Sequence, residues 1–146
     1  MSNRSVGTLK FNVNFKGVEE YKKNVQNSIP KLRNFEYKFL NTLANMVIPI
    51  AMSRTPVDTG RLRRSYKVTK VKQVGNTLEI TVYNDARDNG VGESYASYVE
   101  FGHFTRYRAS WVEGHWMLTV ATDEVKAEMS RVWKKLFNEW VKESGL

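Results

Sequence analysis

The chain has 146 residues, of which 41% are hydrophobic and 12% aromatic, and its net charge is +8. A chain of this length fits one domain, residues 1–146, with a core large enough to need no metal or disulfide. Cysteine is absent from the sequence, which excludes thiolate catalysis, thiolate zinc sites and disulfides and is typical of assembly in a reducing cytoplasm.

The basic charge favours an acidic partner, which can be nucleic acid or protein, but it is equally consistent with a solvated basic surface. Met1–Lys10 is polar, and the apolar stretch Met46–Met52 is too short to span a bilayer. We therefore expect a soluble protein with no secretory signal and no membrane partner.

The first half of the sequence predicts one strand and two helices. Leu9–Phe15 alternates apolar and polar residues, as a half-buried strand does, and Val18–Val25 has helical spacing. A longer helix is expected over about Lys31–Arg54, with a kink at Pro49 and an end before Pro56. Its apolar positions recur every three or four residues: Leu32, Phe35, Phe39, Leu43, Met46, Val47 and Ile50.

A β-hairpin is predicted after the loop Thr55–Gly60. Its strands are Ser65–Val74 and Thr77–Asn84, joined by the turn signal Gly75-Asn76. The apolar phase of the first strand slips between Val68 and Val71, which indicates a bulge there.

The second half predicts two loops and a terminal helix. Asp85–Ser94 and Gly102–Gly114 have loop composition, and the short apolar segment Tyr95–Phe101 between them can be helix or strand. Trp116 to about Lys142 has an apolar helical face. We expect an α+β fold, in which a small antiparallel sheet (the N-terminal strand plus the hairpin) packs against the long helix and the C-terminal helix.

Chemistry-bearing residues are sparse. His103 and His115, with Glu100 and Glu113 nearby, could supply zinc ligands, but their spacing matches no zinc signature. Hydrogen-bonding or interface roles suit these histidines better. A triad of Ser94, His103 and Asp85 can be drawn on paper, yet no nucleophile motif surrounds the serine. We predict no enzymatic activity, no metal and no cofactor.

A basic stretch opens the predicted hairpin. On a strand, Arg63 and Lys67 would share one face with Ser65 and Thr69. Such a ribbon could contact DNA or an acidic surface. The alternative, which we favour, is an edge strand that lysines protect against unwanted pairing. The basic residues are Arg61, Arg63, Arg64, Lys67, Lys70 and Lys72.

Aromatic and arginine side chains are concentrated between Phe101 and Trp116. Tyrosine, tryptophan and arginine dominate the energetic centres of protein interfaces. We expect Phe101 and Trp116 to cap the core, and Tyr107, Arg108 and Trp111 to form a subunit or partner interface.

Two motifs and a looser third one carry a family resemblance. Pro56-Val57-Asp58-Thr59-Gly60 follows the long helix, Tyr95-Ala96-Ser97-Tyr98-Val99-Glu100-Phe101-Gly102 follows the hairpin, and Trp111–Leu118 opens the terminal helix. In this order the segments resemble the head–tail joining, or tail-completion, proteins of long-tailed bacteriophages and prophages. In the third segment Glu113-Gly114-His115 replaces the family's proline-rich turn. The resemblance spans roughly Gly17 to Trp140.

The resemblance implies a structural virion protein of the phage neck, assembled in the host cytoplasm. Its subunits would form a ring, often a hexamer, between head-completion or connector proteins and the tail tube or tail terminator. Phage DNA would pass through the ring and could meet the basic face. The alternative is a basic nucleic-acid-binding module.

The motif residues have physical roles as corner-formers. Pro56 stops the helix, Asp58 can cap local amides, and Gly60 can adopt positive φ. Glu100 and Gly102, preceded by Tyr95 and Tyr98 in the motif, would form a second corner beneath the Gly102–Gly114 loop.

Overall fold

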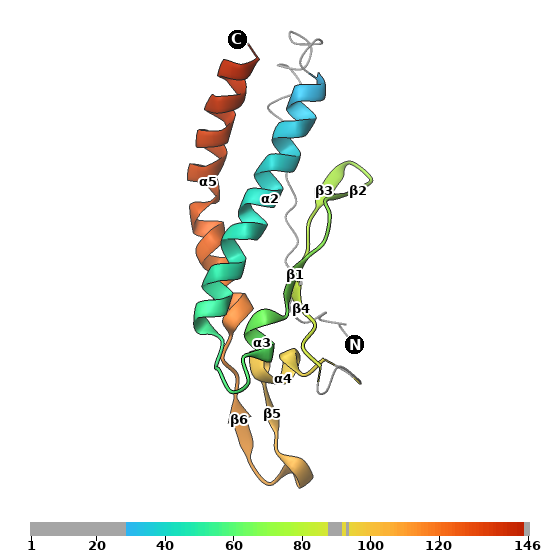
Figure 1. The fold of residues 1–146 in the computed structure, drawn as a ribbon, viewed down its shortest axis with the longest axis vertical. Coiled ribbons are helices and arrows are strands. Elements are labelled where there is room, and N and C mark those ends of the chain that lie inside the picture. The colour runs from blue at the N-terminus through green and yellow to red at the C-terminus, as the bar shows by residue number, and fades with distance from the viewer. Residues whose placement is uncertain (1–28, 88–91, 93, 145–146) are drawn as a thin grey trace.

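A computed structural model describes residues 29–87, 92 and 94–144 of the chain. Two long helices, α2 (Ile29–Arg54) and α5 (Met117–Glu143), lie side by side and antiparallel. Residues 61–64 and 96–113 lie around the end where α2 finishes and α5 begins, and the hairpin of residues 66–84 runs back alongside α2 (Figure 1). This is the predicted α+β class. The predicted strand Leu9–Phe15 and helix Val18–Val25 lie outside the described residues.

The two helices pair because each has an apolar face, and these faces form one core with the first hairpin. Phe35 is the aromatic centre of the pair: its ring lies 6.1 Å from that of Trp133, 6.0 Å from Phe137 and 6.2 Å from Trp140, centroid to centroid. The buried core residues of the helices are Leu32, Phe35, Phe39, Leu40, Leu43, Ala44, Val47, Ala51, Leu118, Ala121, Val125, Val132, Leu136 and Trp140.

Polar contacts along the helix pair agree with its antiparallel direction. The Lys31 Nζ donates to the backbone carbonyl of Glu143 at 3.2 Å. Further along, Lys38 pairs with Glu139 at 3.2 Å, and Arg54 with Glu124. Exposed ion pairs of this kind contribute about 0–1 kcal/mol each, so apolar packing supplies most of the stability of this pair.

The end of α2 is well defined. The helix continues past the exposed Pro49 to Arg54, and the chain leaves it before Pro56, as predicted. The buried Thr55 closes the last turn, because its hydroxyl donates to the Ala51 carbonyl at 2.7 Å.

The predicted hairpin forms in two parts. Strand β1 (Tyr66–Val68) pairs antiparallel with β4 (Val82–Asn84), and β2 (Lys72–Val74) pairs with β3 (Thr77–Glu79). Val68 is opposite Val82 and Lys72 opposite Glu79, so residues 69–71 face residues 80–81, three against two. One extra residue in the first strand is a bulge, and the bulge predicted between Val68 and Val71 is confirmed.

The hairpin packs on the helices through its inner face. Leu78, Ile80 and Val82 are buried in the same core as α2 and α5. The exposed tip also contacts α2, since the Arg33 guanidinium donates to the Gln73 side-chain carbonyl. The predicted packing of the hairpin against both helices is confirmed.

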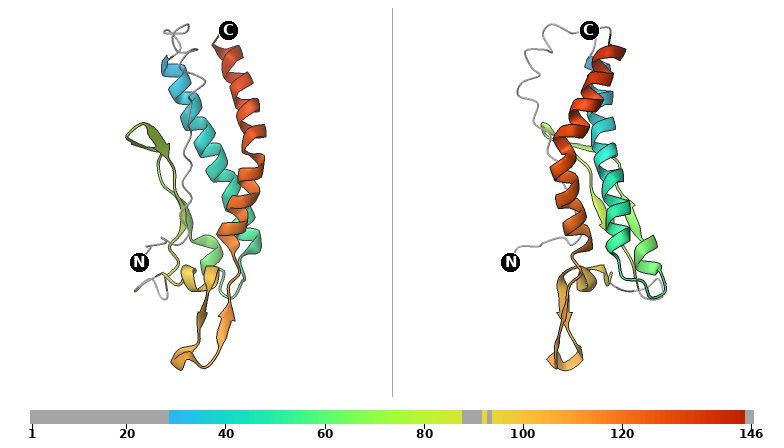
Figure 2. Two further views of the ribbon diagram at one scale, coloured as in Figure 1. Left: turned by 180° about the vertical axis from the view of Figure 1, so that it is seen from behind. Right: turned by 90° about the vertical axis from the view of Figure 1, so that its left-hand side faces the viewer.

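The structure adds to the sequence-based prediction in three segments, one of which had been left open between helix and strand. Arg61–Arg64 forms a helical turn, α3, and is not part of a strand. The segment Tyr95–Phe101, which could have been helix or strand, contains the helix α4 (Ala96–Phe101). The segment expected to be an irregular loop contains a second hairpin, β5 (Gly102–Phe104) and β6 (Trp111–Glu113), with a 3₁₀ turn η3 (Arg106–Arg108) at its tip. Figure 2 shows this hairpin projecting beyond the end of the helix pair.

Within the described part of the chain, none of the helices combines the length and apolar character that a membrane span requires.

We expect Phe35→Ala to lower the free energy of unfolding by about 3–5 kcal/mol, because it removes the ring around which the α2–α5 contact is built. Asn34→Ala is the matched control: Asn34 is the preceding residue of α2 and is exposed, so its substitution should change stability by less than about 0.5 kcal/mol. Urea unfolding followed by circular dichroism measures both. Equal midpoints for the two variants would contradict the packing.

Candidate functional site

The chain motifs meet where α3, α4 and the first turn of α5 come together. Leu62 of α3, Ala96 of α4 and Met117 of α5 are buried in one small apolar cluster, which also contains Ala86. This cluster is separate from the main helix-pair core. It brings the segment after Pro56-Val57-Asp58-Thr59-Gly60 against the segment that begins at Tyr95.

Glu100 occupies the centre of this region. Its side chain is 3% exposed, and its carboxylate accepts hydrogen bonds from the first turn of α5. Oε2 accepts from the Leu118 amide at 2.9 Å, and Oε1 accepts from the Thr119 amide at 2.8 Å and the Thr119 hydroxyl at 2.7 Å. The helix has Trp116 at its N-cap position, and tryptophan has no acceptor with which to cap. Glu100 therefore supplies the cap from another element.

Backbone hydrogen bonds reinforce this junction. The His115 amide donates to the Val99 carbonyl at 2.8 Å, and the Trp116 amide donates to the Glu100 carbonyl at 3.0 Å. The chain thus leaves α4, runs out and back through the β5–β6 hairpin, and returns to the same residue.

Two glycines let the hairpin strands cross tightly at its base. A Cβ on Gly102 would lie 2.4 Å from the Val112 carbonyl oxygen, and one on Gly114 would lie 2.4 Å from the Glu100 carbonyl oxygen. Gly102 also has φ of +83°. The second corner expected at Glu100 and Gly102 is therefore a close backbone crossing. Gly114 and Thr119 were not predicted as part of it, because each becomes a neighbour only when the hairpin folds back.

The first corner lies between α2 and α3. Gly60 adopts φ of +75° and precedes α3, and the Arg64 amide donates to its carbonyl at 3.2 Å. Asp58 is exposed. The side chain that accepts a hydrogen bond from a local amide is instead Thr59, whose hydroxyl accepts from the Arg61 amide at 3.3 Å. Pro56 is exposed at the point where the chain leaves α2.

Tyr66 joins the two corners. Its hydroxyl lies 2.9 Å from the Thr55 Oγ1 and 3.7 Å from the Met117 sulfur. Burial is the main reason why the pKa of Tyr66 is raised above the ordinary 10.0, and the nearby Glu100 charge adds to the effect. The end of α2, strand β1 and the start of α5 are therefore linked through one phenol.

The basic residues do not form the continuous ribbon that was considered. Since α3 is helical, Arg61 and Arg63 do not continue the strand on which Lys67 lies. Their guanidinium groups donate to backbone carbonyls, Arg63 to Thr55 at 3.3 Å and Arg61 to Arg87 at 3.2 Å. Arg64 similarly donates to the Thr59 carbonyl at 3.4 Å. Arg63 and Arg64 therefore stabilise the first corner, and Arg61 connects α3 to the segment after β4.

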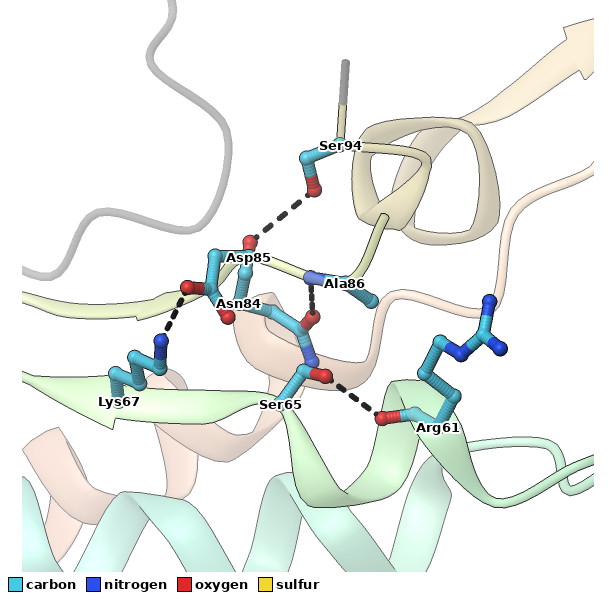
Figure 3. Close-up of polar contacts among 7 residues, drawn as sticks. All are labelled: Arg61, Ser65, Lys67, Asn84, Asp85, Ala86 and Ser94. Carbon is cyan, nitrogen blue, oxygen red and sulfur yellow. Dashed lines mark hydrogen bonds and ion pairs between the residues drawn. The ribbon is translucent and has the colours of Figure 1, made fainter. Parts of the chain in front are cut away.

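The lysines of the first hairpin differ from one another. Lys67 forms an ion pair with Asp85 beside the end of β4, where Asn84 accepts from the Ala86 amide and the Ser94 hydroxyl (Figure 3). Lys70 and Lys72 are exposed toward the hairpin tip. A contact of this hairpin with DNA or an acidic neighbour, through these two lysines and the half-exposed Lys67, stays a prediction.

The predicted interface residues all lie on the second hairpin. Tyr107 is 87% exposed at its tip, with Arg108 beside it, and Trp111 begins the returning strand and is 47% exposed. Trp111 pairs across the strands with Phe104, which is 58% exposed; their ring centroids are 4.9 Å apart in an edge-to-face arrangement. Residues 102–114 therefore present a preformed aromatic surface.

Trp116 and Phe101, which were expected to cap the core, contact each other at 5.3 Å edge to face, and Trp116 stays 44% exposed. His103 lies 5.7 Å from the Tyr98 ring, centroid to centroid, and its Nδ1 is 3.3 Å from the Tyr98 carbonyl. Tyr98 thus supports the base of the second hairpin, while Tyr95 lies against the small apolar cluster. The described residues contain no group of three or more potential metal ligands.

Comparison with known proteins gives one match. The sequence profile of a family described as bacteriophage HK97-gp10-like tail components matches residues 15–102, more than half of the chain. No curated protein matches, and no solved structure matches.

We expect Glu100→Gln to lower the free energy of unfolding by about 1–3 kcal/mol, because the amide nitrogen would face a backbone or hydroxyl donor of α5 and leave it unsatisfied. Glu139→Gln, which removes a half-exposed ion pair with Lys38, should cost less than about 1 kcal/mol. Denaturant unfolding compares the two variants. A loss for Glu139→Gln as large as that for Glu100→Gln would show that the carboxylate is not a specific cap.

We expect Gly102→Ala to destabilise the protein more than Gly75→Ala. Both glycines have positive φ, so each alanine meets backbone strain of about 1 kcal/mol. Only at Gly102 would the new Cβ meet backbone atoms; at Gly75 it would meet nothing within 4 Å. The overpacking adds roughly 1–3 kcal/mol. Thermal unfolding of both variants tests this. Equal losses of stability would mean that the backbone at the hairpin base can shift to accommodate the new Cβ.

Proposed function

Because this chain belongs to the HK97-gp10-like family of bacteriophage tail components, we propose that it is a structural subunit of the phage neck that completes the tail and joins it to the head connector. The family match carries this proposal. It covers all of α2, the first corner, the first hairpin and α4, and it ends at Gly102 where the second hairpin begins. We propose a purely structural role, with no catalysis and no cofactor.

We propose further that the subunits form a closed ring, as the resemblance to tail-completion proteins implies, with six copies as the working number. A head-to-tail contact between identical subunits either closes into a ring or continues as a filament, depending on the angle at the contact. The elongated helix pair, with hairpins fixed to it at defined corners, is a body suited to setting such an angle. The tight backbone crossing at Gly102 and Gly114 supports a rigid connection.

The neighbours in this proposal are a head-completion or connector protein on one side of the ring and a tail-tube or tail-terminator protein on the other. DNA would pass through the ring. The net charge of +8 favours contact with DNA or with acidic neighbours. The subunit would assemble in the host cytoplasm and remain in the virion.

Deletion of the gene in the phage that carries it tests the proposed function. We expect DNA-filled heads and separate tails to accumulate, because the connecting ring is absent, and infectious particles to return when the wild-type protein is supplied. Electron microscopy of the lysates distinguishes unjoined from joined particles, and native mass spectrometry of the purified protein gives the number of subunits. Normal joined, infectious particles from the deletion strain would contradict the proposal.

A further inference from the structure

The β5–β6 hairpin carries an exposed apolar surface that the fold of the subunit does not use. Its exposed large side chains are Phe104, Tyr107, Trp111 and Val112. The hairpin projects past the helix pair, so these side chains lie away from the main core (Figure 2). Exposed apolar surface gathered on one element is typical of a protein interaction site.

The tip of the hairpin has a defined and unusual backbone. Tyr107 and Arg108 adopt φ of +68° and +54°, a region that residues other than glycine rarely occupy. Hydrogen bonds hold this geometry: the Thr105 amide donates to the Ser110 carbonyl at 2.8 Å, and the Arg108 amide donates to the Thr105 carbonyl at 2.9 Å. The turn therefore holds the Tyr107 backbone in one conformation and leaves its side chain exposed to solvent. Backbone strain of this kind clusters at binding sites.

Positive charge surrounds the exposed tyrosine. Arg106 lies 5.4 Å from the Tyr107 ring centroid, and Arg108 follows it. The sequence from His103 to Val112 contains no acidic residue. Within the described part of the chain, neither Arg106 nor Arg108 has an ion-pair partner. The tip is thus an aromatic side chain between two unneutralised guanidinium groups, a combination that fits an apolar pocket with a carboxylate rim.

A second copy of this chain is a poor occupant for such a tip. The chain has 15 acidic against 23 basic side chains, so a rim of several carboxylates is hard to assemble on its surface. Several of its acidic side chains are also already paired: Asp85 with Lys67, Glu124 with Arg54, Glu128 with Arg131 and Glu139 with Lys38. The complementary surface is therefore expected on a different, acidic protein.

We infer that the β5–β6 hairpin is a docking finger, whose Tyr107 enters an apolar pocket rimmed by Asp and Glu on a different virion protein, with Arg106 and Arg108 on that rim. The inference rests on the proposed function for the setting in which the partner is met. It does not follow from the family match, which ends at Gly102. The ring contact between copies is then made elsewhere on the body.

The test uses the full-length protein and particles purified from the deletion strain. The probes are fluorescently labelled wild type, Tyr107→Ala, the double variant Arg106→Glu with Arg108→Glu, and a control, Lys134→Glu with Lys135→Glu. The control makes the same charge change at two exposed lysines of α5. Circular dichroism and melting temperature confirm that each variant is folded, as expected for substitutions at exposed positions.

We expect Tyr107→Ala to bind the particles roughly 30-fold more weakly than the wild type, the effect of losing an interface hot spot. The arginine double variant should fail to bind and to restore infectivity, and the control should behave as the wild type. If the wild type restores infectivity and both hairpin variants restore it equally well, the inference that the hairpin is a docking finger is wrong, and the proposed function stands. If the wild type itself fails to restore it, the proposed function fails.

Suppressors of the arginine double variant identify the occupant. We expect infectious revertants to carry Asp or Glu changed to a neutral or basic residue in another virion gene. Suppressors at acidic positions of this chain, or loss of the homo-oligomer in Tyr107→Ala, would overturn the inference in favour of a second copy. Binding of naked phage DNA that only the hairpin variants lose would overturn it in favour of a DNA contact.

Discussion

The arrangement of the second hairpin and of α5 in this protein depends on one buried carboxylate. Glu100 accepts from two backbone amides and one hydroxyl at the start of α5, so its charge faces the positive end of the helix dipole as well as three hydrogen-bond donors. A buried carboxylate without such partners would carry a large desolvation cost. Here the amides of α5 also gain, because the N-cap position has no side-chain acceptor of its own. Each side therefore satisfies a group that would otherwise be unpaired.

This single contact sets the direction of the second hairpin. The chain enters the hairpin directly after Glu100 and leaves it at Trp116, whose amide returns to the Glu100 carbonyl. Gly102 and Gly114 remove the side chains that would separate the two passing strands. The hairpin base is consequently held between α4 and α5, and α5 is held along α2 by its aromatic face.

The sequence predicted the helix pair and the first hairpin well, because their signals are local and repeated. The spacing of Leu32, Phe35 and Phe39 is visible in the sequence alone, and so is the phase slip before Val71 that marks the bulge. The capping of α5 by Glu100 could be predicted from the sequence only in part. Its place in a motif indicated a corner, but its partner Thr119 lies 19 residues on, beyond a hairpin, and no local pattern joins the two.

Two segments have a structure that the sequence analysis did not predict, and the reason is shared. Arg61–Arg64 is too short for helical periodicity and contains one buried apolar residue, Leu62, so basic residues dominated its interpretation. The second hairpin has strands of only three residues, and its turn lacks the glycine or asparagine that normally supplies positive φ. In both segments tertiary contacts, and not local propensity, select the conformation.

The strained turn of the second hairpin has a thermodynamic consequence for any partner. Positive φ at Tyr107 and Arg108 costs of order 1–3 kcal/mol each in the free subunit, and Tyr107 is too exposed to recover that cost by burial. The Thr105–Ser110 hydrogen bonds and the Phe104–Trp111 ring pair offset it within the hairpin. A turn already held in this shape loses little further conformational entropy on binding, so more of the contact energy remains as affinity. The strain therefore fits a turn that is preorganised to expose an aromatic residue, and Glu100 joins the base of the same hairpin to the start of α5.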